Sequence, residues 1–408
     1  GGMTSSDPGG QGCCGFRSNF RFVCILFFFA LILPCVAQDF EGDLLARIDL
    51  VRPVTELSLP VYSYLQDATG QDYVLVFATR SELDKAGWSY QILDSGYESS
   101  DYVFATWRRR SSPRPDPGLP VIHDDGRSLL LRATEPEAET LARLGFELRR
   151  FPRQPMVFTG SETKSLLKFK AFSYSELVAD MIGEVKTTNL YTFVSQFSGV
   201  TRAVTGGEWY QILTRHTSKA IPTQRATEFA FQHLQALGLN VRYHSWGRGI
   251  YDNRNVVADW PGGSLSNEIV LIVAHLDDAP SGDTAPGADD NASGSAGVLM
   301  AADILAKYRF DRTVRFVLFT GEEQGMYGSG EYAAAAYAAG DNITGVLNLD
   351  MISWDSDSSP TLRLHTRLTG DSGYAGDLAI AEVFTNVVAN YGMAANLTPI
   401  ITADGNIY

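Results

Sequence analysis

Apolar residues in the second half of the chain form two kinds of pattern, which alternate. Short continuous runs of β-forming residues predict strands, and the longest runs are typical of strands buried on both faces. The predicted strands are 255–259, 268–274, 313–319, 345–350 and 362–365. Helical spacing of apolar residues predicts helices at 223–238, 298–305, 333–336 and 378–391. From about residue 185, this alternation predicts an α/β fold: a three-layer sandwich with a mostly parallel central sheet.

Residues 38–155 have a different pattern, in which one unit occurs twice. Each copy has an apolar strand ending in Ala-Thr, a short helix, and a Gly-aromatic pair that begins another strand; the copies begin at Tyr73 and Leu129. This duplication predicts a small N-terminal α+β domain of ferredoxin-like type. We expect residues 156–189 to form a linker and the start of a larger domain, which continues over 190–408.

The first 37 residues have the pattern of a secretory signal peptide. Arg17 and Arg21 form a basic flank, 22–33 is an unbroken apolar run, and small residues precede a cleavage point after Ala37. About 12 apolar residues are too few to span a bilayer comfortably, so a short membrane anchor is the weaker alternative. We expect a secreted or otherwise exported protein, with no stable membrane insertion after cleavage.

Cysteine usage and charge narrow the chemistry further. All four cysteines (Cys13, Cys14, Cys24 and Cys35) lie in this leader, so the exported chain would fold without disulfides. The formal net charge is −14 at pH 7. Because binding to phosphate backbones needs basic surface, this charge argues against nucleic acid as a partner.

Polar clusters follow several predicted strands of the larger domain. The clusters are His275 to Asp278, Gly287 to Asn291, Thr320 to Glu323, and Asp350. In open α/β sheets, ligands bind beyond the carboxyl ends of the strands. One acidic loop would mean little, but four clusters at one edge would repel each other unless a cation neutralised them. Imidazole and carboxylates without thiolate favour zinc or a related divalent ion.

These clusters resemble those of the co-catalytic dizinc aminopeptidases, exopeptidases of the bacterial leucyl aminopeptidase and glutaminyl cyclase-like superfamily. The matching stretches are AHLDD (274–278), APGADDNASG (285–294), FTGEEQGMYGS (319–329) and NLDM (348–351). The resemblance covers about 190–408 and does not extend to 38–155. It implies a metalloaminopeptidase that removes N-terminal residues from peptides and, when full length, binds two zinc ions per chain.

The resemblance also implies a role for each site residue. The implied metal ligands are His275 and Asp350 on one ion, Glu323 on the other, and Asp290 as the bridge. Glu322 would be the general base that activates a water bridging the metals. Asp277 would orient His275, because a metal-bound histidine usually donates its other N–H to an acceptor. A cis peptide is implied between Asp290 and Asn291.

One residue of the family pattern is missing. The family supplies a final histidine to the second metal near its C-terminus, and no histidine follows His365 here. His365 lies in the predicted strand 362–365, too early for that role, and we interpret it as structural. We therefore expect the sequence to be a fragment that ends shortly before this ligand.

Other functions on the same scaffold are open. A glutaminyl cyclase binds one zinc, and the His275-x-Asp277 pair, which builds the extra metal position, argues against it. A non-catalytic interaction domain would tend to lose ligands, whereas every other site position is present. For residues 38–155 we expect a propeptide that aids folding or blocks the site, with a permanent accessory domain as the alternative.

Overall fold

The computed structural model describes residues 43–96, 98, 101–107, 113–156, 173–279, 282–354, 359–394 and 396–405. Residues 41–408 form one compact unit. The predicted signal peptide, with its four cysteines, lies outside the described residues. No helix in the described part of the chain combines the length and the apolar character that crossing a membrane requires.

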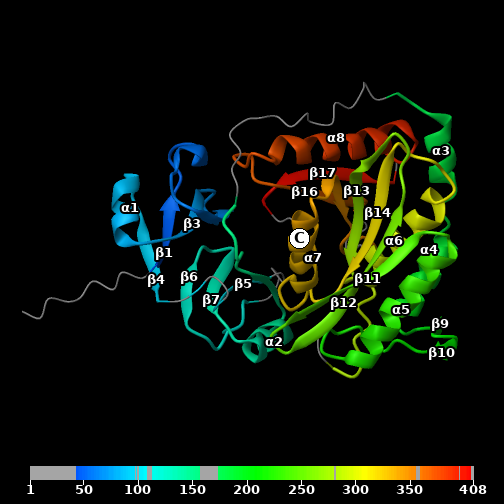
Figure 1. Cartoon of the computed structure of the whole chain (residues 1–408), viewed down its shortest axis with the longest axis horizontal. Coiled ribbons are helices and arrows are strands. Elements are labelled where there is room, and N and C mark those ends of the chain that lie inside the picture. Colours follow the sequence, from blue (N-terminus) through cyan, green and yellow to red (C-terminus); the bar gives the residue numbers. More distant parts are fainter. Residues whose placement is uncertain are drawn as a thin grey trace, which may run out of the picture. The chain divides into compact units, whose positions relative to one another are not determined.

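The first part of the described chain contains two four-stranded antiparallel sheets of the same topology (Figure 1). The first sheet has the order β2-β3-β1-β4, with β1 (Leu44–Asp49), η1 (Val54–Glu56), β2 (Val61–Gln66), β3 (Asp72–Ala78), α1 (Arg80–Ala86) and β4 (Gln91–Ser95). The second has the order β6-β7-β5-β8, with β5 (Tyr102–Trp107), β6 (Val121–Asp124), β7 (Ser128–Arg132), α2 (Glu135–Leu144) and β8 (Phe146–Arg150). The two copies inferred from the sequence therefore share one topology.

The strand pairing corrects the prediction of a ferredoxin-like domain. A ferredoxin-like fold would join both copies in one sheet, but here each copy forms its own sheet. The reason is two additional strands in each copy, one of which separates the two predicted strands: β1 lies between β3 and β4, and β5 lies between β7 and β8. The two sheets share one apolar cluster that includes Leu45, Tyr73, Phe104 and Phe151.

The repeated Ala-Thr and Gly-aromatic pairs mark the ends of α1 and α2. The backbone N–H of Thr79 donates to Glu82, and that of Thr134 donates to Glu137, each at 2.8 Å. Such reciprocal capping satisfies donors that the first helical turn leaves open. The pattern that suggested a duplication is therefore a pattern of helix caps.

The larger part of the chain is built on a five-stranded sheet of order β11-β12-β14-β13-β15. Its strands are β11 (Asn240–Arg248), β12 (Tyr251–Trp260), β13 (Leu265–His275), β14 (Arg312–Phe319) and β15 (Asn342–Asn348). β13 runs parallel to β14 and β15, but β12 is antiparallel to β11 and β14. The sheet is therefore mixed, not mostly parallel. The two-residue turn at 249–250 explains this, because only antiparallel strands can be joined so tightly.

Helices cover both faces of this sheet. α4 (Thr187–Phe197), α5 (Ala220–Ala236) and α6 (Ala292–Leu305) lie on one face, and α7 (Tyr327–Ala339) lies on the other (Figure 1). Alternate residues of β12 point to opposite faces of the sheet. Val256 and Ala258 pack with α4, α5 and α6, and Val257 packs with α7. Helices on both faces make the three layers that the sequence predicted.

The remaining elements lie outside the five-stranded sheet. They are α3 (Glu176–Gly183), the hairpin β9 (Ala203–Thr205) and β10 (Glu208–Tyr210), the parallel pair β16 (Thr361–Thr366) and β17 (Thr398–Ala403), and α8 (Tyr374–Asn390). α8 packs on β16 and β17.

The neighbouring parallel strands β14, β13 and β15 determine where polar side chains gather. Their carboxyl ends meet at one edge of the sheet, and the segment after each strand begins at that edge. These segments are the ones in which the sequence placed its acidic clusters.

Candidate metal centre

His275 is the last residue of β13 and lies at the centre of the acidic cluster. Its Nε2 atom is 3.1 Å from a carboxylate oxygen of Asp290, 3.5 Å from Asp350 and 4.0 Å from Glu322. The imidazole is only 4% exposed. The structure therefore brings together side chains from three strand ends and from the loop before α6.

The site residues form two groups that could each hold a metal ion. The ligand atoms of His275, Asp290 and Asp350 lie within 4.8 Å of one another, and so do those of His275, Glu322 and Glu323. The first group is the set expected for one metal together with the bridging aspartate. The second group contains both the predicted base Glu322 and the predicted ligand Glu323.

The electrostatics of the cluster fit a bound cation. Burial and neighbouring carboxylates raise the pKa values of Glu322 and Glu323. Burial alone would lower the pKa of His275, but the surrounding carboxylates outweigh it and raise that pKa. Within the described residues, Oδ1 of Asp350 and Oε1 of Glu322 are buried without a hydrogen-bond partner. A divalent cation would compensate this negative charge, and Oδ1 of Asp350 could bind it.

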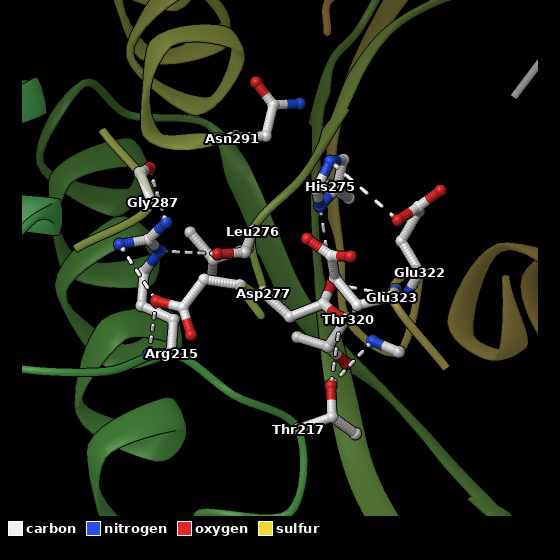
Figure 2. A network of polar contacts seen from close by, with 12 residues as sticks. Arg215, Thr217, His275, Leu276, Asp277, Gly287, Asn291, Thr320, Glu322 and Glu323 are labelled. Atoms are coloured by element: carbon white, nitrogen blue, oxygen red, sulfur yellow. Dashed lines mark hydrogen bonds and ion pairs between the residues drawn. The ribbon is translucent and has the colours of Figure 1, made fainter. Parts of the chain in front are cut away.

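Asp277 connects His275 to the Glu322–Glu323 turn (Figure 2). Its Oδ1 atom lies 3.7 Å from Nδ1 of His275, on the ring side opposite the carboxylate cluster. The same carboxylate accepts the backbone N–H groups of Glu322 and Glu323, each at 3.2 Å. At 3.7 Å this oxygen is too far from Nδ1 for a hydrogen bond, and Nδ1 has no hydrogen-bond partner among the described residues. The carboxylate of Asp277 does support the turn after β14.

Asn291 connects the loop before α6 to the end of β15. The peptide between Asp290 and Asn291 is cis, as the family resemblance implied. The Asn291 side chain caps α6 by accepting from Gly294 N at 2.8 Å, and its Nδ2 donates to Leu349 O at 2.9 Å. Although Asn291 begins a formal glycosylation sequon, this Nδ2 belongs to a fully buried residue. Its contacts hold Asp290 and Asp350, the neighbours of Asn291 and Leu349, near each other.

The start of α6 leaves no space for a larger residue at Gly294. A Cβ atom there would collide with the Leu349 carbonyl oxygen and the Asn291 side chain. We expect Gly294→Ala to lower the free energy of unfolding by about 1–3 kcal/mol, because the surrounding backbone must move. Gly330→Ala in α7 is the control, since a Cβ there meets nothing within 4 Å; alanine should raise helix stability by about 0.5–1 kcal/mol. Urea unfolding of both variants measures the difference, and equal midpoints would contradict the expected crowding.

The sequence analysis did not identify a group of residues that supports the site from the segment 214–217, before α5. Arg215 is fully buried, and its side chain donates to the backbone oxygens of Leu276, Pro286 and Gly287 at 2.6–3.0 Å. It also forms a 3.3 Å ion pair with Asp278. These contacts hold the segments that carry His275 and Asp290. A single arginine before a helix has no periodic or motif signal, so only the fold reveals it.

The other histidines lie outside the candidate ligand groups. His365 is in β16, and its Nδ1 atom lies 3.1 Å from both carboxylate oxygens of Asp404, which fits its interpretation as structural. His216 lies beside Arg215, with its Nε2 3.4 Å from Glu139 and 3.2 Å from Gln324 Nε2. Among the described histidines, only His275 belongs to a group of side chains that could hold a metal.

Sequence comparison identifies the class of protein to which this site corresponds. The model of peptidase family M28 matches residues 255–404, which include His275 and every acidic candidate of the site. The resemblance to the zinc aminopeptidase superfamily, inferred from four short stretches, is therefore confirmed.

Individual relatives carry names that agree with this class. The chain is 36% identical over 103 residues to a probable zinc metalloprotease of Leptosphaeria maculans, covering 24% of each protein. It is 27% identical over 236 residues to a probable leucine aminopeptidase 1 of Trichophyton verrucosum, covering 54% of this chain and 60% of the relative. The chain thus spans less than two thirds of either relative.

A solved structure shares the fold over a longer range. The LapA aminopeptidase of Legionella pneumophila superposes with a TM-score of 0.52 at 16% identity, covering 75% of this chain and 81% of that chain. Residues 190–408 make up little more than half of the sequence. The likeness in fold therefore extends into the region before residue 190, for which no family resemblance was found in the sequence.

Proposed function

We propose that this chain is an exported zinc-dependent exopeptidase that hydrolyses N-terminal residues from peptides. The observation that carries the proposal is the buried His275, with its Nε2 3.1–4.0 Å from the carboxylates of Asp290, Asp350 and Glu322 at one edge of the sheet. The names of the relatives favour an aminopeptidase within this class. The apolar leader with its basic flank favours export.

Two zinc ions would be held by four protein side chains. His275 and Asp350 would bind one ion, Glu323 would bind the other, and Asp290 would contact both. When bound, the ions polarise the scissile carbonyl and lower the pKa of a bound water toward about 7. Histidine with carboxylates and without cysteine suits zinc in such a site.

Glu322 is the residue that moves protons. One of its oxygens, Oε1, is buried with no hydrogen-bond partner among the described residues, so it is available to accept a proton from the attacking water. The protonated carboxyl can then donate to the amine of the leaving peptide. We propose that Asp277 orients His275, which lies 3.7 Å away, while its hydrogen bond with the backbone N–H of Glu322 supports the base.

Metal removal and reconstitution test this function. We expect a chelator to abolish cleavage of a panel of aminoacyl amides and zinc to restore it, because the residues alone do not polarise the carbonyl strongly enough. Elemental analysis of a full-length protein should find two zinc ions per chain, as the family resemblance implies. One zinc per chain with cyclisation of N-terminal glutamine would favour a glutaminyl cyclase. A zinc-loaded chain that cleaves none of the amides would favour an interaction domain.

We propose further that residues 38–155 are a propeptide that covers the site. Glu139 of α2 accepts a 2.6 Å hydrogen bond from the Tyr251 hydroxyl and lies 3.4 Å from His216 Nε2. Glu147 of β8 is one of the charges that raise the pKa of Glu322. The second copy of the repeat therefore contacts the elements beside the candidate base. A covering segment at this position would restrict the access of peptides.

Sequencing the N-terminus of the secreted protein tests the propeptide. We expect a mature start within or just after the basic segment 149–155, which contains Arg149, Arg150 and Arg153. Cleavage of the purified chain there should raise kcat/KM by at least about tenfold. A mature start near Gln38 with full activity would instead identify a permanent accessory domain.

A further inference from the structure

We propose that Thr217 is a positioning residue of this centre, which holds the orienting carboxylate of Asp277 against the turn that carries Glu322 and Glu323. The inference rests on the proposed zinc site and extends it to a residue outside all four acidic clusters. Thr217 lies before α5 and is 3% exposed. Its hydroxyl is directed at the segments after β13 and β14 (Figure 2).

The Thr217 hydroxyl joins these two segments. It donates to Oδ2 of Asp277 at 3.1 Å and accepts the backbone N–H of Gly321 at 2.9 Å. Asp277 follows β13, and Gly321 follows β14. One hydroxyl thus connects the strand end that carries His275 to the strand end that carries Glu322, and both of its hydrogen-bonding roles are used.

Thr217 also completes the set of donors around Asp277. That fully buried carboxylate accepts the Glu322 and Glu323 backbone N–H groups as well as the Thr217 hydroxyl. These three hydrogen bonds fix the plane of the carboxylate. The Oδ1 atom of that plane lies 3.7 Å from Nδ1 of His275. Loss of one donor would free Asp277 to rotate, and both His275 and the turn would lose their common support.

The position of Thr217 is itself fixed. Its carbonyl oxygen accepts a 3.0 Å hydrogen bond from Nδ2 of Asn253 in β12. Two residues earlier, the fully buried Arg215 holds the same segment to the backbone after β13 through Leu276 O. A side chain held in this way can orient a neighbouring group without a large entropic cost when the metal binds.

Two substitutions at Thr217 test the contributions of its hydroxyl and of its methyl group separately. Thr217→Val keeps the shape and removes the hydroxyl, whereas Thr217→Ser keeps the hydroxyl and removes the methyl. Thr205→Val is the matched control, because Thr205 is also fully buried and donates to a carboxylate, Glu228, at 2.9 Å, in the β9 hairpin. Zinc affinity, measured by competition with a chromophoric chelator, is the first readout, and it does not depend on catalysis.

We expect Thr217→Val to weaken zinc binding by about 10–100-fold, the range seen when supports of metal ligands are removed. kcat for an aminoacyl amide should fall by about tenfold with little change in KM, and Thr217→Ser should stay within about threefold of the original chain in both measurements. Thr205→Val should lower the unfolding midpoint and leave zinc affinity unchanged. If the valine variant does not fold, Thr217→Ala compared with Thr217→Ser tests the same loss of the hydroxyl.

Two results would overturn the role of Thr217. One is a valine variant with unchanged zinc affinity and kcat. The other is a serine variant more impaired than the valine variant, which would indicate a packing role for the methyl group. An original chain that binds zinc but cleaves no peptide would contradict the proposed function, while the zinc competition would still test Thr217. An original chain that binds no zinc would overturn both.

Discussion

Replacing Glu322 with glutamine is expected to lower kcat by about 10²–10⁴-fold, the usual contribution of a general base, while zinc stays bound. Glutamine has nearly the same shape as glutamate but cannot accept the proton of the attacking water. The folded protein should be at least as stable as before, because burial disfavours the charged form of Glu322 and raises its pKa. Steady-state kinetics, elemental analysis and thermal unfolding of the same preparation measure the three quantities.

Two further variants make this result specific. Glu323→Gln removes a predicted ligand, and it should lose zinc and activity together. Glu331→Gln is the control, since Glu331 in α7 lies 3.6 Å from Arg153 and 3.7 Å from Arg248, and it is not in the candidate ligand groups. If Glu322→Gln loses zinc while Glu323→Gln keeps it, the roles of the two neighbouring glutamates are reversed.

Replacing Arg215 with methionine is expected to lower the free energy of unfolding by about 3–5 kcal/mol, the cost of leaving one member of a buried ion pair without its partner. Asp278 would stay buried, and burial already raises its pKa despite the charge of Arg215. The backbone oxygens of Leu276, Pro286 and Gly287 would also lose a donor. Chemical denaturation of the metal-free protein measures the loss.

Matched substitutions show whether this effect comes from burial. Arg242→Met removes a 2.6 Å ion pair with Asp259, but the Arg242 side chain is 47% exposed, so we expect a loss of at most about 1 kcal/mol. Arg215→Lys should not restore stability fully, because an ammonium cannot reproduce the planar set of donors. Equal unfolding midpoints for Arg215→Met and Arg242→Met would contradict the proposed role of Arg215 in stabilising the segments that carry His275 and Asp290.

The arrangement of strands was predicted only in part, because an apolar pattern reveals a strand but not the strand with which it pairs. β13 contains a continuous apolar run, β14 is mostly apolar and β15 contains the apolar pair Val346 and Leu347, so their existence and their common edge could be inferred from the sequence. The antiparallel direction of β12 depends on its pairing with β11, a strand whose exposed and partly buried residues have no clear apolar pattern. In the first part of the chain, the helix caps repeat visibly, whereas the position of β1 and β5 inside their sheets is a property of pairing between distant segments.

The sequence by itself determined which residues gather at the candidate metal centre. His275, Asp290, Glu322, Glu323 and Asp350 follow or lie between neighbouring parallel strands, and the geometry of such a sheet brings its strand ends together. Only the tertiary structure decided how these residues are supported. Thr217 contacts Asp277 across 60 positions and Gly321 across 104, and Arg215 reaches Gly287 across 72. Hydrogen bonds of this kind need only one side chain at the right place in space, so they leave no spacing or periodicity that a sequence can display.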